Sequence, residues 1–238
     1  MSNRRPAEFV LVHGAWAGAW SCARVIDRLM AQGHRIHVPT LSGLGERCHL
    51  AGREINLTTH VNDIVNEVLW KDLNNIVLVG LSYGGLVITG AAEKLGERIS
   101  SIVYVDAFIP ADGQSFADIT GWSPDGEMIA PPSMPAGAFA NESDRAWVAS
   151  KVTPQPVATF KEKLRVSGAY QRVPNKTYVH ATGWAGPFGS LVKALQSDSS
   201  WSVLPLDCGH DVPNLMPNEL AAILHGCAEK LSVEKPFP

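Results

Sequence analysis

The sequence predicts an α/β fold built on a doubly wound, mostly parallel sheet with an inserted helical lid. Three observations predict it: continuous apolar runs typical of buried strands, segments of helical periodicity between them, and glycine-rich turns where a strand meets a helix. The chain has 238 residues, of which 45% are hydrophobic and 18% charged, so it can bury a sizeable core. We expect residues 1–238 to form one domain.

The strand signals are runs rich in Val, Ile and Leu. They are continuous rather than alternating, which is typical of strands covered by helices on both faces of a parallel sheet. Three strong runs span residues 9–13, 75–80 and 99–106, and three weaker ones span 35–38, 176–181 and 201–206.

Apolar residues at helical spacing predict three helices between these runs, over residues 19–32, 58–72 and 83–97, and a fourth after the last run, over residues 217–231. In the first, one face carries Val25, Ile26, Leu29 and Met30, and Gly33 supplies the stop. The second opens with Thr58 and Thr59 as candidate N-caps.

Residues from about 110 to 175 interrupt this alternation. They are rich in Pro, Gly and Ala through 124–135, and they become amphipathic through 144–152 and 157–166. A structureless loop of that length is uncommon in a compact domain. We therefore predict an inserted helical lid over the sheet rather than a second domain.

Composition excludes several classes of function. Lys and Arg number 20 and Asp and Glu 23, which gives a net charge of −3. This composition lacks the excess of basic residues that is typical of proteins that bind nucleic acid or an anionic membrane surface. No apolar run approaches the roughly 18 residues that span a bilayer. The first apolar stretch is short and has no cleavage site, so we expect a cytoplasmic protein. Whether it forms a homodimer stays open.

The four cysteines show no CxxC spacing, which argues against zinc. We expect small buried side chains at Cys22, Cys48, Cys208 and Cys227.

The pentapeptide Gly80-Leu81-Ser82-Tyr83-Gly84 lies between a predicted buried strand and a predicted helix. A serine at such a sharp turn projects its hydroxyl above the carboxyl edge of the sheet, and glycines on either side remove side chains that would clash. The N–H groups of the following helix face negative charge that develops nearby. Ser82 is the candidate nucleophile; an idle serine in a glycine-rich turn is the alternative.

The first strong strand ends in His13-Gly14-Ala15-Trp16. Gly14 allows the chain to turn so that the N–H of Ala15 faces the same site, and the N–H of Tyr83 directly follows the serine. Two such donors predict an oxyanion hole. We expect His13 to bond the backbone of this turn rather than to act as an acid or base.

His210 is the candidate general base. It follows the last predicted strand, in Asp207-Cys-Gly-His-Asp-Val-Pro, and precedes the final helix. A base at this point reaches over the sheet edge toward Ser82, in the chain order serine first and histidine last. We expect structural roles for the histidines on or beside helices or in other strands, namely His34, His37, His60 and His225.

Together these motifs resemble the α/β-hydrolase superfamily, most closely its small branch of plant-type methyl esterases, hydroxynitrile lyases and bacterial esterases. The resemblance rests on FVLVHGAWAGAW, VLVGLSYGG, IVYVDAFIPADGQS and GHDVPNLMPNELAAIL, and the lid is the part least constrained by it. It implies a catalytic triad and acyl transfer from a small-molecule ester, chemistry that requires no metal and no organic cofactor.

The acid of the triad is where this chain departs from most relatives, which place Asp or Glu after the penultimate strand. Here no carboxylate follows that strand until Asp198. A histidine needs a partner on its other nitrogen to hold the useful tautomer. The best candidate is Asp106, at the end of the neighbouring strand, an arrangement that some members of the superfamily use. Asp207, Asp198 or a bare Ser–His pair are the alternatives.

Aromatic residues near the motifs predict an apolar pocket suited to a small hydrophobic or aryl ester. The candidates are Trp16, Phe108, Trp122, Trp147 and Trp184, each of which is equally compatible with packing in the core.

Other functions use the same scaffold. A hydrolase of lactones, carbamates or activated amides would use the same residues. A hydroxynitrile lyase is disfavoured, because the threonine and lysine of that branch are Gly14 and Asp211 here. A non-catalytic ligand receptor is disfavoured because the serine, the histidine and an acid are all present.

Overall fold

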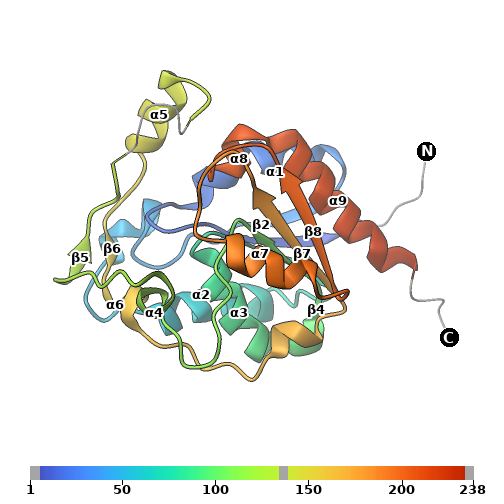
Figure 1. Cartoon of the computed structure of the whole chain (residues 1–238), viewed down its shortest axis with the longest axis horizontal. Coiled ribbons are helices and arrows are strands. Elements are labelled where there is room, and N and C mark those ends of the chain that lie inside the picture. Colours follow the sequence, from blue (N-terminus) through green and yellow to red (C-terminus); the bar gives the residue numbers. More distant parts are fainter. Residues whose placement is uncertain (1–5, 134–138, 234–238) are drawn as a thin grey trace.

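A six-stranded parallel sheet forms the centre of the computed structural model, which describes residues 6–133 and 139–233 (Figure 1). Its order is β2-β1-β3-β4-β7-β8, and every neighbouring pair is parallel. The strands are β1 (Glu8–Val12), β2 (Arg35–His37), β3 (Ile76–Leu81), β4 (Ile99–Val105), β7 (Asn175–Ala181) and β8 (Trp201–Leu206). All six lie within two residues of the predicted runs, so the doubly wound parallel sheet is confirmed.

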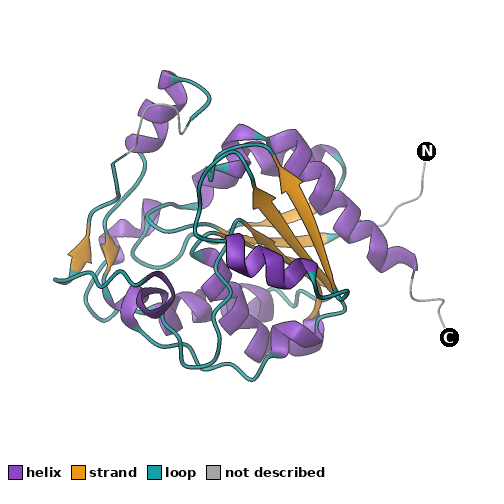
Figure 2. Ribbon diagram, viewed as in Figure 1, coloured by secondary structure: helices purple, strands orange, loops and turns teal. Residues whose placement is uncertain are grey.

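Helices cover both faces of this sheet, which is why its strands are apolar throughout (Figure 2). One face packs against α2 (Leu57–Trp70) and α3 (Gly84–Leu95). The other packs against α1 (Ala23–Ala31) and α9 (Pro217–Val233). The remaining helices outside the lid are α7 (Gly189–Gln196), α8 (Val212–Leu215) and the short 3₁₀ turns η1 (Ala19–Cys22), η2 (Gly45–Leu50) and η3 (Gly96–Arg98).

Two details of the predicted helices are wrong. Asn56, not Thr58 or Thr59, is the N-cap of α2: its side chain accepts the N–H of Thr59 at 2.9 Å, and the two residues form a capping box. Met30, expected in the core, is 60% exposed, because α1 buries only a narrow stripe at Val25 and Leu29.

The predicted lid consists of short elements rather than long helices. They are α4 (Phe116–Thr120), β5 (Met128–Ile129), α5 (Glu142–Ala149), β6 (Gln155–Pro156), α6 (Ala158–Lys161) and η4 (Ala169–Arg172). The amphipathic stretch 157–166 is helical only over α6, because tertiary contacts take its later backbone groups: the Leu164 N–H donates to Gln114 O and the Val166 N–H to Asp112 Oδ1.

The strands β5 and β6 pair antiparallel into a small ribbon, in which Ile129 lies opposite Gln155. We call β5 and β6 together the lid ribbon. In Figure 1 the lid ribbon lies with α4 and α6 at the left of the molecule. Helix α5 is joined to α1 by a bidentate ion pair, in which Arg24 contacts Asp144 at 2.6 and 3.0 Å.

None of the described helices is long and apolar enough to cross a membrane.

Candidate active site

The site lies where three neighbouring strands end. The order β1-β3-β4 brings their carboxyl ends to one edge of the sheet, and the chain reverses its winding direction between β1 and β3. Five non-glycine residues in the described ranges have positive φ, and three of them, Trp16, Ser82 and Asp106, follow these strands closely. Backbone in that region is strained and persists where the surroundings hold it, commonly at functional sites.

Ser82 occupies a strand-to-helix turn of the predicted kind, with φ of 52°. Its N–H donates to Val105 O at 3.2 Å, and its own carbonyl accepts the N–H of Phe108 at 3.2 Å. The turn has no room for a side chain at Gly84, where a Cβ would lie 2.5 Å from Val12 O. The backbones of three strand ends therefore meet around the nucleophile.

The three candidate triad residues form one unbroken chain of hydrogen bonds. Ser82 Oγ lies 2.9 Å from His210 Nε2, and His210 Nδ1 lies 2.7 Å from Asp106 Oδ2. An ionised carboxylate only accepts, so Nδ1 carries the proton and Nε2 presents its lone pair to the serine hydroxyl. The alternative acids do not reach His210: Asp198 accepts the N–H of Ser200 in an exposed turn, and Asp207 is exposed.

Asp106 is fully buried, and donors surround its carboxylate. Besides His210, Oδ2 accepts the indole N–H of Trp184 at 2.8 Å, and Oδ1 accepts the backbone N–H of Ala181 at 3.2 Å. His180 Nδ1 lies 3.4 Å from Oδ1. These donors compensate the charge for its loss of water.

The sequence predicts Trp184 as a candidate pocket residue and predicts no role in the site for His180. The ring centroids of Trp184 and His210 are 4.7 Å apart, and Trp184 is not among the residues that line the cavity. Trp184 therefore packs against the base and donates to the acid. Their positions could have indicated both roles. His180 lies near the end of β7 and Trp184 just after it, and β7 is the neighbour of β4, the strand that Asp106 follows.

The two candidate oxyanion donors belong to the loops that follow β1 and β3. In the described part of the chain, neither the Ala15 N–H nor the Tyr83 N–H donates to another residue. Gly14 packs against the nucleophile, since a Cβ there would lie 3.3 Å from Ser82 Cβ and 3.9 Å from Oγ. Both amides are therefore available beside the serine, as an oxyanion hole requires.

His13 bonds the backbone of this loop. Its Nε2 accepts the N–H of Leu41 at 3.1 Å, so Nδ1 carries the proton and donates to Gly14 O at 2.8 Å. Burial lowers the pKa of His13 to about 4, which keeps the ring neutral. The bond to Gly14 O fixes the peptide group whose N–H belongs to Ala15.

His60 is a second buried, neutral histidine nearby. Its Nε2 donates to Ser42 O at 2.9 Å, and its Nδ1 accepts the hydroxyl of Tyr83 at 3.0 Å. Burial lowers its pKa to about 4 as well. The two histidines together hold the 41–42 loop against the residues that flank the nucleophile.

A mostly apolar cavity of about 240 Å³ opens beside Ser82 and His210. Trp16 and Trp20 line it, and the segment between β4 and β7 contributes Pro132, Phe139, Val148 and Val152. Of the five expected aromatic residues, only Trp16 lines this cavity. The other four lie elsewhere: Phe108 contacts Phe116 and Phe188, Trp122 contacts Phe160, Trp147 contacts Trp20, and Trp184 contacts His210.

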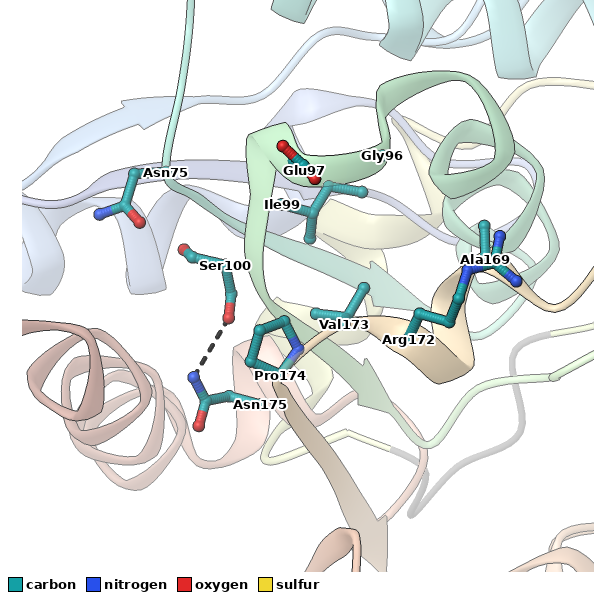
Figure 3. A pocket seen from close by; sticks show the side chains of 10 residues that line it. All are labelled: Asn75, Gly96, Glu97, Ile99, Ser100, Ala169, Arg172, Val173, Pro174 and Asn175. Carbon is teal, nitrogen blue, oxygen red and sulfur yellow. Dashed lines mark hydrogen bonds between the residues drawn. The ribbon is translucent and has the colours of Figure 1, made fainter. Parts of the chain in front are cut away.

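A larger cavity, of about 660 Å³, lies at the opposite edge of the sheet (Figure 3). It is lined by residues at the amino ends of β3, β4 and β7, and the amide of Asn175 donates to Ser100 O there. It holds no nucleophile paired with a base, so its size does not make it the reaction site. Within residues 6–133 and 139–233, no three His, Cys, Asp or Glu side chains are grouped as a metal site.

Comparison with known proteins identifies the family. A model described as "Alpha/beta hydrolase family" matches residues 9–223. The chain belongs to the α/β hydrolases. This α/β hydrolase is 37% identical over 234 residues to the carbendazim hydrolyzing esterase of Nocardioides sp. (strain SG-4G), covering 90% of this chain and 97% of that one.

Two further relatives are consistent with this assignment. Methylesterase 1 of Arabidopsis thaliana is 36% identical over 110 residues, covering 45% of this hydrolase and 42% of that protein. The solved extracellular alpha/beta-hydrolase from a Paenibacillus species superposes with a TM-score of 0.80 at 25% identity, covering 93% of this chain and 99% of that chain.

Replacing the acid tests the chain of hydrogen bonds. Asp106→Asn should lower kcat by up to about 10⁴-fold, because an amide can donate to His210 and favour the wrong tautomer. The thermal midpoint measures folding in parallel, and the exposed Asp198→Asn is the matched control, with kcat near wild type. Near-normal turnover in Asp106→Asn would rule out this triad.

The buried histidines predict a pH-dependent stability. The folded protein binds their protons only as pH falls toward about 4, whereas the unfolded chain binds them from about 6.5. The contribution of the two neutral histidines to the free energy of unfolding is complete above about pH 6.5 and is lost as the pH falls toward 4. At pH 5 the loss is roughly 2 kcal/mol per histidine. Urea unfolding at pH 7 and pH 5 should show a smaller loss for His60→Gln than for the wild type. An equal loss of unfolding free energy in the wild type and in His60→Gln would contradict a buried, neutral His60.

Proposed function

We propose that this α/β hydrolase cleaves small carboxylic esters and carbamates through an acyl-enzyme on Ser82. The observation that carries the proposal is the chain of short contacts from Ser82 Oγ through His210 to Asp106. The carbendazim hydrolyzing esterase and the methylesterase among its relatives support a hydrolase of the carboxylesterase type.

The geometry fits a two-step acyl transfer. His210 Nε2 takes the proton of Ser82 as Oγ attacks the carbonyl carbon, and the Ala15 and Tyr83 amides stabilise the resulting oxyanion. His210 then gives its proton to the departing alkoxide, which leaves as an alcohol. Water, deprotonated by His210 in turn, attacks the acyl carbon. The bond from that carbon to Oγ then breaks, His210 returns the proton to Ser82 Oγ, and the acid leaves.

The cavity supports a small, largely apolar substrate. Its lining beside Ser82 is mostly apolar, and Trp16 and Trp20 provide flat surfaces suited to an aryl group. A carbamate fits the same machinery, and the chain aligns over nearly its whole length with an esterase named for the carbamate carbendazim. Esters and carbamates therefore belong to one proposal.

No observation supports the lyase alternative. Asp211, where the lyase branch carries lysine, lines the cavity, and burial raises the pKa of this carboxyl. It cannot supply the positive charge that would stabilise cyanide.

We also propose a cytoplasmic location. The thiols of Cys22, Cys48 and Cys208 form no disulfide within the described residues, which suits a reducing compartment. Cell fractionation should recover the protein with the cytoplasmic markers, and recovery with secreted or membrane fractions would contradict this.

Covalent labelling tests the nucleophile. An aryl fluorophosphonate should add its mass to the peptide that contains Ser82, because only an activated serine displaces fluoride readily. Ser82→Ala should take up no label while keeping its thermal midpoint. Label on any other residue would contradict the proposal.

A matched substrate pair tests the chemical class. Methyl benzoate and methyl N-phenylcarbamate carry the same leaving group and similar aryl groups, and both should release methanol. Ser82→Ala should abolish both reactions. Release from neither compound, with small aryl acetates also intact, would refute ester and carbamate cleavage.

A further inference from the structure

Trp16 directly follows the candidate oxyanion donor Ala15, and its backbone is strained. Its φ is 59°, in the left-handed region that bulky residues avoid. A residue stays in that region only where its surroundings hold it there. The contacts that hold Trp16 therefore also set the direction of the neighbouring Ala15 peptide.

Lid residues provide the hydrogen bonds of Trp16. Its N–H donates to Gln155 Oε1 at 2.8 Å, and its indole N–H donates to Ile129 O at 3.2 Å. Its carbonyl accepts the N–H of Thr153 at 3.0 Å. Gln155 and Ile129 are cross-strand partners in the lid ribbon, so one pair of facing residues binds both the backbone and the side chain of Trp16.

The orientation of the Gln155 amide is fixed. Gln155 is fully buried, and its Nε2 donates to Thr159 Oγ1 at 2.8 Å. Thr159 gives its own hydroxyl proton to Pro156 O at 2.7 Å, so it can only accept from Gln155. Oε1 is therefore the atom that faces Trp16.

We propose that Gln155 is a positioning residue for the oxyanion hole. Ala15 lies between two peptide groups: His13 holds the preceding one at Gly14 O, and Gln155 holds the following one at the Trp16 N–H. With both fixed, the Ala15 N–H stays directed at the site. The lid ribbon thereby supports the oxyanion hole through Trp16; this inference rests on the proposed function.

Loss of the acceptor should act on the chemical step rather than on binding. Gln155→Met keeps the length of the side chain and removes the oxygen, so the Trp16 N–H loses its partner and the Ala15 peptide can turn. We expect kcat to fall about 10- to 100-fold, less than or equal to the effect of deleting an oxyanion donor, with KM within about threefold. The affinity for an aryl trifluoromethyl ketone, which forms a tetrahedral oxyanion on the serine, should fall by a similar factor.

Three variants provide controls. Gln155→Glu keeps an acceptor oxygen and should retain more of the wild-type kcat than Gln155→Met. The exposed Gln171→Met makes the same chemical change on η4 and should leave kcat unaltered. Should Gln155→Met fail to fold, the isosteric Thr159→Val takes its place, because it removes the acceptor that orients Gln155; it should lower kcat without raising KM.

Ser82→Ala, assayed in parallel, separates the two proposals. An inactive Ser82→Ala with kcat of Gln155→Met within twofold of wild type would overturn the role of Gln155 and leave the proposed function standing. A Gln155→Met variant with a raised KM and an unchanged kcat would overturn the role of Gln155 in the same way. An active Ser82→Ala would overturn the proposed function, and this inference with it.

Discussion

The buried carboxylate of Asp106 is the charge on which the geometry of the site depends. A fully buried anion is costly unless donors surround it, and this one accepts from His210, Trp184 and the backbone of Ala181. Those donors come from β7, from the loop after it and from the loop after β8. The charge therefore fixes three segments at once, and it sets which nitrogen of His210 faces the serine.

The parallel sheet explains how distant residues meet. Because β1, β3 and β4 are neighbours, the loops after them carry Ala15, Ser82 and Asp106 to one edge. Each loop includes a non-glycine residue of positive φ, at Trp16, Ser82 and Asp106. The loop that carries Trp16 is bonded on two sides. His13 donates to Gly14 O, and Gln155 Oε1 accepts the N–H of Trp16. Strain at Trp16 is thus balanced by hydrogen bonds from outside the central sheet, whereas the N–H groups of Ser82 and Asp106 donate to the neighbouring strands β4 and β7.

Much of the fold could be predicted from the sequence because its signals are local. Continuous apolar runs predict the six strands, and the glycines around Ser82 predict a tight turn between a strand and a helix. Because no carboxylate follows the penultimate strand until Asp198, the sequence predicts Asp106, at the end of the preceding strand, as the acid, and its Oδ2 lies 2.7 Å from His210 Nδ1.

The rest depended on contacts that no local pattern encodes. Residues 162–166 have an amphipathic spacing, yet their backbone bonds to the 112–114 segment instead of forming a helix. Trp184 looked like a pocket residue because aromatic composition does not reveal which way an indole N–H points. Gln155 gave no signal, since a glutamine between two prolines has neither periodicity nor a motif. Its partner, Trp16, lies 139 residues away in the chain.

The most direct measurement of the central claim is the tautomer of His210 by ¹⁵N NMR in the free enzyme at neutral pH. If the Asp106 carboxylate orients the ring, the neutral imidazole carries its proton on Nδ1, and the signal of that proton shows protection from solvent exchange. A neutral ring protonated on Nε2, with no such protected proton, would contradict the account, because the serine hydroxyl would then face a donor instead of a base.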